Sequence, residues 1–279
     1  MLNTPNRRRT GRERLALLLA GLCFAGLGSA VASAQDSQDL AKQLANPIAN
    51  LMSFPLQINY DEGFGPNGDG ERVLTNFQPV IPIKLSDDWL VISRTILPIV
   101  WQDDVVPFEG EQFGLSDTTQ SLFLSPKEPG PFGLIWGAGP VFLLPTATED
   151  TLGSEKWGAG PTVVGLMQHG PWTYGVLANH VWSFAGDHDR ADVSSTFVQP
   201  FLNYTTSTAT TIFLNAEASY DWETDQASIP INLGVNQLFK IGGQAFQIGA
   251  GVRYWADSPD GGPDDFGFRI NLVALFPTS

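Results

Sequence analysis

The sequence predicts an all-β protein, a transmembrane antiparallel up-and-down β-barrel of about twelve strands with a short N-terminal helix. Three observations support this fold class. The chain has 29 Gly, 20 Pro and 11% aromatic residues but only 16% charged residues, a composition that favours strands and turns over surface helices. Apolar and polar residues alternate over strand-length segments. The connections between these segments alternate between short turns and acidic loops.

The first segment, residues 1–34, has the pattern of a cleavable secretory signal peptide. Five Arg precede an apolar run from Leu15, and the run ends in Ala32-Ser33-Ala34, so the mature chain is expected to begin at Gln35. An uncleaved helical anchor is the alternative, because the run is long enough to span a bilayer. The single cysteine, Cys23, lies in this leader, so the mature chain can form no disulfide.

Removal of the leader leaves 28 acidic and 10 basic side chains, a net charge of −18. Such acidity argues against nucleic acid as a partner. Residues 35–51 form the one helical pattern in the mature chain, because Leu40, Leu44 and Ile48 recur near helical spacing. Pro47 is expected to end or kink this helix. We expect the helix at the periplasmic mouth of the barrel; a plug that enters the lumen is the alternative.

The barrel itself is expected over residues 52–279. Twelve segments have strand length, an even number as bacterial single-chain barrels require: 52–61, 72–83, 89–102, 115–124, 133–145, 157–168, 172–184, 194–206, 210–222, 228–239, 245–256 and 266–276. In residues 210–222, Ile212 and Leu214 lie on a lipid-type face, opposite Asn215 and Glu217. The fourth and fifth segments are rich in Gly and could slip by one residue.

The connections predict the orientation of the barrel. Short turns lie near residues 86–88, 169–171, 206–208 and 241–243, with a longer Pro/Gly-rich connection at 125–131. Acidic residues occupy the other connections, at 61–71, 103–111, 149–155, 187–192, 223–225 and 257–265. Short periplasmic turns and longer outside loops are typical of outer-membrane barrels. The acidic loops are therefore expected outside, where they could share divalent ions with lipopolysaccharide phosphates.

Several motifs resemble those of a bacterial outer-membrane barrel family: FQPVIPI at 77–83, GPVFLLPTATEDTLGSEKWGAGP at 139–161, LANHVWSFAG at 177–186 and GVRYWADSPDGGP at 251–263. The family is named after the meta-pathway of phenol degradation, and some relatives carry the misleading label neuromedin U. The resemblance implies a transporter or channel in the outer membrane of a Gram-negative bacterium. Two departures are Leu115-Ser116-Asp117, where relatives often have a second Gly, and Pro277-Thr278-Ser279 after Phe276, where many barrels end on an aromatic residue.

An enzyme is the main alternative class. Outer-membrane phospholipases use a His-Ser pair on the outer wall, but His180 and Ser183 are three residues apart on one strand and so face opposite sides. We predict no catalytic residue, no metal site and no cofactor. Oxygen-rich loops at 67–71 and 257–265 lack the spacing of the twelve-residue calcium loop and are expected to be solvated.

The predicted lumen-lining residues are mostly neutral amides with a few charges: Gln57, Asn59, Asn76, Gln78, Arg94, Gln199, Asn203, Asn215, Glu217, Asp221, Asn232, Asn236, Gln247, Arg253, Arg269 and Asn271. The charges could pair into a constriction, form a selectivity ring, or merely fill the barrel. The expected function is a channel for small solutes, including aromatic or hydrophobic ones if the family name reflects real substrates. The alternative is a non-conducting barrel with a structural or surface-interaction role.

Overall fold

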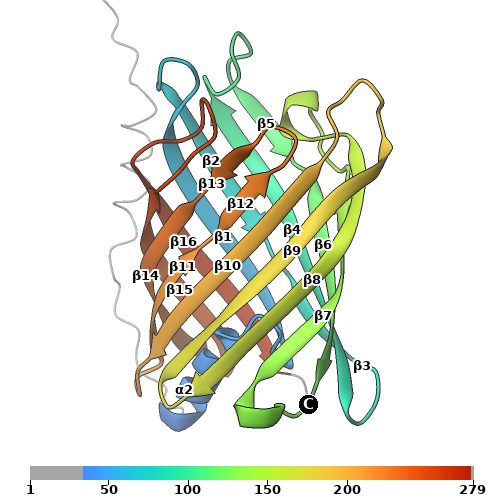
Figure 1. The fold of residues 1–279 in the computed structure, drawn as a ribbon. Helices are drawn as coiled ribbons and strands as arrows, with labels where there is room; N and C mark the ends of the chain where they lie inside the picture. The colour runs from blue at the N-terminus through green and yellow to red at the C-terminus, as the bar shows by residue number, and fades with distance from the viewer. Residues whose placement is uncertain (1–33, 278–279) are drawn as a thin grey trace, which may run out of the picture. The chain divides into compact units, whose positions relative to one another are not determined.

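The computed structural model describes residues 34–277. The predicted signal peptide, apart from Ala34, lies outside the described residues, as do Thr278 and Ser279. One α-helix, α2 (Ala34–Leu44), precedes the strands (Figure 1). Within the described chain, no helix combines the length and the apolar character needed to cross a membrane.

Twelve antiparallel barrel strands follow α2, as the sequence predicts. Eight are continuous: β1 (Leu51–Phe64), β4 (Trp89–Asp103), β7 (Ile135–Leu144), β8 (Lys156–His169), β9 (Trp172–Gly186), β10 (Ser194–Thr205), β15 (Gln244–Trp255) and β16 (Phe266–Pro277). Four consist of two pieces each: β2 (Gly70–Phe77) with β3 (Val80–Lys84), β5 (Gln112–Leu115) with β6 (Thr118–Pro126), β11 (Thr210–Ala216) with β12 (Ala218–Asp221), and β13 (Gln226–Ser228) with β14 (Pro230–Ile241).

Each strand pairs with its neighbours in sequence, and the pairing of β1 with β16 joins the two ends of the chain. The barrel is therefore closed, which removes the exposed sheet edges that a bilayer would not tolerate. The break between β11 and β12 falls at Glu217, opposite Pro230. Pro230 has no N–H to donate, so only the bond from Glu217 N to Pro230 O forms there, at 3.0 Å.

Burial alternates along the strands with a period of two. In β15, Ile248 is 41% exposed whereas its neighbour Gln247 is 6% exposed. In β11, Leu214 is 41% exposed whereas Phe213 is 5% exposed. The outer surface is thus apolar along these strands, and the inner face holds the polar residues that the sequence places there.

Aromatic residues on the outer surface gather toward both ends of the strands. Trp172 and Tyr204 make an edge contact 4.8 Å apart where β9 begins and β10 ends. Tyr254 and Phe266 lie 5.1 Å apart at the opposite end, where β15 ends and β16 begins. Two aromatic girdles that flank an apolar band are typical of transmembrane barrels.

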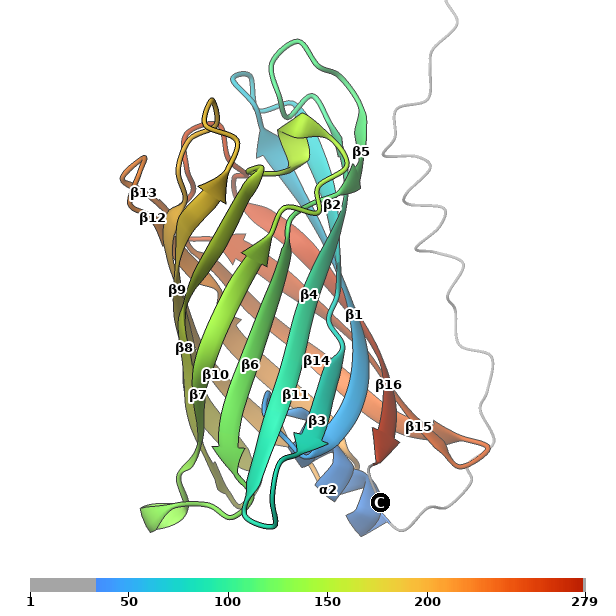
Figure 2. The same cartoon turned by 90° about the vertical axis from the view of Figure 1, so that its right-hand side faces the viewer.

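The two kinds of connection lie at opposite ends of the barrel (Figures 1 and 2). We call the end with the short turns and α2 the helix end, and the end with the acidic connections the loop end. Some acidic residues that the sequence argument assigned to connections lie on strands, and one of them is buried: Asp61 lies within β1, because β1 runs on to Phe64. Alternation from Gln57 and Asn59 turns Asp61 into the barrel.

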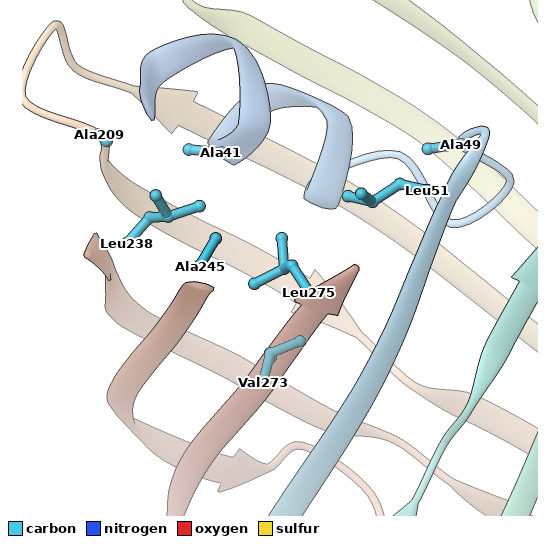
Figure 3. Close-up of a cluster of buried hydrophobic side chains, with 8 residues drawn as sticks. All are labelled: Ala41, Ala49, Leu51, Ala209, Leu238, Ala245, Val273 and Leu275. Atoms are coloured by element: carbon cyan, nitrogen blue, oxygen red, sulfur yellow. The ribbon is translucent and has the colours of Figure 1, made fainter. Parts of the chain in front are cut away.

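Helix α2 ends at Leu44, seven residues earlier than the predicted boundary at residue 51. Asn46 ends it: its side-chain Oδ1 accepts a bond from Ile48 N at 3.0 Å, and Pro47 then prevents helix continuation. The helix packs inside the helix end of the barrel, in a cluster of buried apolar side chains (Figure 3): Ala41, Ala49, Leu51, Ala209, Leu238, Ala245, Val273 and Leu275. This placement matches the alternative of a plug that enters the lumen.

A second apolar cluster covers part of the inner face, which the sequence argument did not predict. We call it the apolar wall: Ile92, Phe123, Val164, Leu166 and Leu177, from β4, β6, β8 and β9, with Ile48 packed against them. A Cβ on Gly137 would lie 3.2 Å from Phe123 Cβ and 3.3 Å from Ile48 Cδ1, so glycine leaves room for this packing. We call the rest of this inner face the polar wall, because it carries the inward polar side chains of β1, β11, β14, β15 and β16, among them Asn59, Asn215, Asn232, Gln247 and Arg269.

Candidate lumen site

Glu217 is the centre of the polar wall. Arg269 reaches it with two parallel bonds, from Nη1 to Oε1 at 2.9 Å and from Nη2 to Oε2 at 2.7 Å. Arg253 adds a third, from Nη1 to Oε2 at 3.1 Å. Paired bonds of this kind are among the stronger and most directional hydrogen bonds in proteins. Both carboxylate oxygens of Glu217 therefore accept hydrogen bonds from arginine side chains.

Asp61 extends this arrangement on the side of the loop end. Its Oδ1 lies 3.2 Å from Arg253 Nε and accepts a bond from Trp255 Nε1 at 2.8 Å. The Arg253 guanidinium also stacks over the Trp255 ring, 4.6 Å from its centroid. We call Asp61, Glu217, Arg253 and Arg269 the charge layer. The sequence argument missed Asp61 as a lumen residue because it grouped Asp61 with the acidic connection at 61–71, although the alternation of β1 turns it inward.

Amide side chains hold the arginines and one another. Arg269 Nε donates to Asn59 Oδ1 at 2.7 Å, so each of the three guanidinium nitrogens of this buried side chain donates to an acceptor on the polar wall. Asn232 Nδ2 donates to Asn215 Oδ1 at 2.9 Å, and Asn271 Nδ2 donates to Asn236 Oδ1 at 3.1 Å. Such a network fixes side chains that would otherwise be costly to bury.

Arg94, unlike Arg253 and Arg269, has a neutral side chain as its hydrogen-bond partner. Its Nη2 donates to Gln78 Oε1 at 3.1 Å, and the side-chain amides of Gln78 and Gln57 lie 2.8 Å apart. Among residues 34–277, no carboxylate lies within ion-pair distance of Arg94. Glu217 attracts it only from farther away. Arg94 is therefore a cation on the inner face of β4 that has a neutral partner.

Two cavities lie inside the barrel. The helix-side cavity has a volume of about 230 Å³, and the segment from Ala41 to Leu51 borders it together with the polar wall. The loop-side cavity has a volume of about 250 Å³ and borders Asp61, Arg72, Arg253 and Trp255. No described residue borders both, and Arg269 faces the first whereas Arg253 faces the second. The charge layer therefore separates the cavities.

Most predicted lumen residues border the helix-side cavity: Gln57, Gln78, Arg94, Gln199, Asn203, Asn215, Asn236, Gln247, Arg269 and Asn271. Asn59, Glu217, Asn232 and Arg253 lie in or against the charge layer. Asn76 is paired with Gln57 across β1 and β2 and borders neither cavity. Asp221 lies apart from the layer, because its Oδ1 accepts the turn amides of Glu223 and Thr224.

His180 is the candidate base of the hydrolase alternative. His180 Nδ1 lies 2.7 Å from Thr196 Oγ1, a neighbour that the sequence argument did not identify. Thr196 Oγ1 also accepts a bond from Trp222 Nε1 at 2.8 Å. Ser183 instead bonds Asp192, at 3.2 Å. Over the described chain no carboxylate is bonded to His180, so it has no third group to orient it as a base.

The carboxylates of the acidic loops are the candidate metal ligands. In the part of the chain that the structure describes, no group of three or more His, Cys, Asp or Glu side chains is arranged to hold a metal ion. The acidic loops use some of their carboxylates locally: Asp187 Oδ1 accepts the amide of Asp189 at 2.8 Å, and Asp264 Oδ1 accepts that of Asp265 at 2.8 Å.

A closed twelve-stranded antiparallel barrel with an apolar outer surface is the fold of outer-membrane β-barrel proteins. The crystal structure of an outer membrane channel from Pseudomonas putida F1 shares this fold, with 14% identity, a TM-score of 0.62, and coverage of 81% of this chain and 95% of the other. More distant matches include outer membrane phospholipase A from Escherichia coli, with 11% identity, a TM-score of 0.45 and coverage of 81% and 97%. The KdgM porin matches with 12% identity, a TM-score of 0.42 and coverage of 80% and 99%.

At these identities the likeness concerns the fold. No protein-family model matches the sequence, and no curated protein matches it either. The resemblance to the family named after the phenol meta-pathway therefore stays a prediction from its motifs.

Proposed function

We propose that this protein is an outer-membrane channel for small solutes. The observation that carries the proposal is the interior: a closed barrel with an apolar outer surface encloses two cavities, each bordered by arginine side chains. A barrel that served only as an anchor would need no charged side chains around internal cavities. In this proposal the loop end faces the outside and contacts lipopolysaccharide, and the helix end faces the periplasm, as the lengths of the connections favour.

The charge layer would be the main barrier to conduction. It lies between the two cavities, and its members bond one another, so a solute that passes must go around or displace these side chains. Helix α2 narrows the helix end further. Conductance is therefore expected to be small, in keeping with a barrel whose strand number lies between the filled eight-stranded and the open sixteen-stranded classes.

Single-channel recording in a planar bilayer tests the proposal. The double variant Glu217→Ala with Arg253→Ala removes one charge of each sign from the barrier, so we expect a larger conductance than in the wild type. The matched control is Lys84→Ala with Asp87→Ala, which removes an exposed ion pair of 2.7 Å near the helix-end turn and should leave conductance unchanged. If neither the wild type nor the Glu217/Arg253 variant conducts, the channel proposal fails.

The second candidate is a non-conducting barrel with a structural or surface-interaction role. The specific observation in its favour is that the members of the charge layer are already paired and that α2 packs against the inner surface at the helix end. The solute class of the channel rests on the family resemblance, which suggests aromatic or otherwise hydrophobic compounds.

A further inference from the structure

Arg94 borders the helix-side cavity and has no carboxylate at ion-pair distance among the described residues. Burying a guanidinium away from water is costly unless a carboxylate or several acceptors compensate it. Within the described chain Arg94 has one side-chain acceptor, the neutral amide oxygen of Gln78 at 3.1 Å, and no carboxylate at ion-pair distance. It is partly accessible, and it borders the helix-side cavity.

Glu217 does not supply the missing charge. Its Oε1 and Oε2 already receive three bonds of 2.7 to 3.1 Å from Arg253 and Arg269. The other interior carboxylate, Asp61, is paired with Arg253 and borders the other cavity. The described residues that border the helix-side cavity include two arginines, Arg94 and Arg269, and no carboxylate. The helix-side cavity therefore has an excess of positive charge on the side of Arg94.

The rest of the cavity is not uniformly polar. Phe201, Phe213 and Val80 border it alongside the amides. Gly234 and Gly251 lie beside the Phe213 ring, where a Cβ at Gly251 would come within 3.1 Å of the ring edge, so this ring is held in a fitted position. A volume of about 230 Å³ is below the roughly 300–1,000 Å³ of sites for drug-sized ligands, which suits a molecule of about one ring.

We propose that the helix-side cavity is a binding site for small monocarboxylic acids with an aromatic or otherwise apolar body. Arg94 binds the carboxylate, because a guanidinium presents paired donors that match a carboxylate. Phe201 and Phe213 contact the apolar body, and the amides accept or donate to its remaining polar atoms. This proposal rests on the proposed channel function, since it names a class of solute that would pause on the helix side of the charge layer.

Fluorine NMR of the full mature protein in detergent tests the site with two probes of nearly equal shape, 4-fluorobenzoate and 4-fluorobenzamide. We expect the benzoate to bind at least about tenfold more tightly than the neutral benzamide, and Arg94→Gln to weaken the benzoate by about tenfold. Arg94→Lys keeps the charge and should recover part of the affinity. Arg190→Gln, an arginine of the loop end that bonds Asp150 O at 2.7 Å, is the matched control and should bind as the wild type does.

Equal binding of the two probes to the wild type would overturn the proposal, even if Arg94→Gln failed to fold. Unchanged benzoate binding to folded Arg94→Gln would also overturn it, as would a loss in Arg190→Gln as large as that in Arg94→Gln. The measurement needs no conduction, so the two proposals fail separately. Conductance without benzoate binding refutes the site alone, and benzoate binding without conductance refutes the channel alone.

Discussion

The polar wall and the apolar wall line the same barrel and are built from the same kind of strand. On the apolar wall, Ile92 and Phe123 are fully buried against neighbours from adjacent strands and against Ile48. On the polar wall, Arg269 is equally buried, but its neighbours are Glu217 and Asn59. Shortening one apolar side chain lowers stability in proportion to the contacts that are lost. Removing one partner of a buried ion pair leaves the whole charge of the other partner uncompensated.

A second contrast concerns charge. The loops at one end carry most of the acidic residues, whereas the described residues that border the helix-side cavity include two arginines, Arg94 and Arg269, and no carboxylate. Acidic loops raise the concentration of cations at the mouth, and salt screens this effect over about 10 Å at 0.1 M. The interior favours anions. In the proposed channel, the mouth and the helix-side cavity would therefore attract charges of opposite sign.

The largest expected effect is on the polar wall. Glu217→Leu leaves Arg253 with Asp61 but removes the carboxylate that is bonded to Arg269, so we expect a loss of about 3–5 kcal/mol in the free energy of unfolding. Urea unfolding in lipid vesicles measures it. Glu217→Gln keeps acceptor capacity and should lose less. A stability equal to the wild type for Glu217→Leu would show that water already compensates the arginines.

On the apolar wall, Ile92→Ala removes a side chain with no exposed surface. We expect a loss of about 2–5 kcal/mol, because a cavity remains where the methyl groups packed. Ile92→Val in the same assay should lose about 0.5–1.5 kcal/mol. If Ile92→Ala and Ile92→Val were indistinguishable, this wall would be loosely packed, and the contrast between the two walls would disappear.

The lipid-facing surface gives a third comparison on β15. Ile248→Arg places a cation on the outer surface near the middle of the strand, which costs about 2–4 kcal/mol in barrels of this kind. Gln247→Arg, one residue away, points into the helix-side cavity and should cost much less. Folding into vesicles followed by urea unfolding measures both. Equal tolerance of the two variants would mean that the facing of β15 is reversed.

The smallest effect is expected at the loop end. The hydrogen bond from Lys156 Nζ to Asp192 Oδ1, 3.0 Å long, lowers the pKa of Asp192 below its usual value. A lowered carboxylate pKa in the folded state contributes stability above the unfolded pKa, and that contribution is lost as the pH falls through the folded pKa. The unfolding temperatures of the wild type and of Asp192→Asn should therefore differ slightly at neutral pH. They should become equal at a pH below the pKa of Asp192 in the folded protein. A difference that persists at acid pH would exclude this ion pair as its cause.

The sequence by itself determined the strands. Alternation with a period of two is a local property of the pleated backbone, so residues such as Leu214 and Ile248 could be assigned to the outer surface without knowledge of their neighbours. The acidic and short connections likewise followed from local composition. The end of α2 at Leu44 could have been refined from Asn46 and Pro47, because both act within one turn of the chain.

Only the tertiary structure decided which inward residues meet. Arg269 bonds Asn59, 210 positions earlier, and Trp255 bonds Asp61, 194 positions earlier, because β1 and β16 close the barrel. Side chains that meet across the interior are selected by strand order, tilt and register, which no single strand contains. For the same reason the sequence named Arg94, Arg253 and Arg269 as lumen charges but could not tell that two of them are paired and that Arg94 is not.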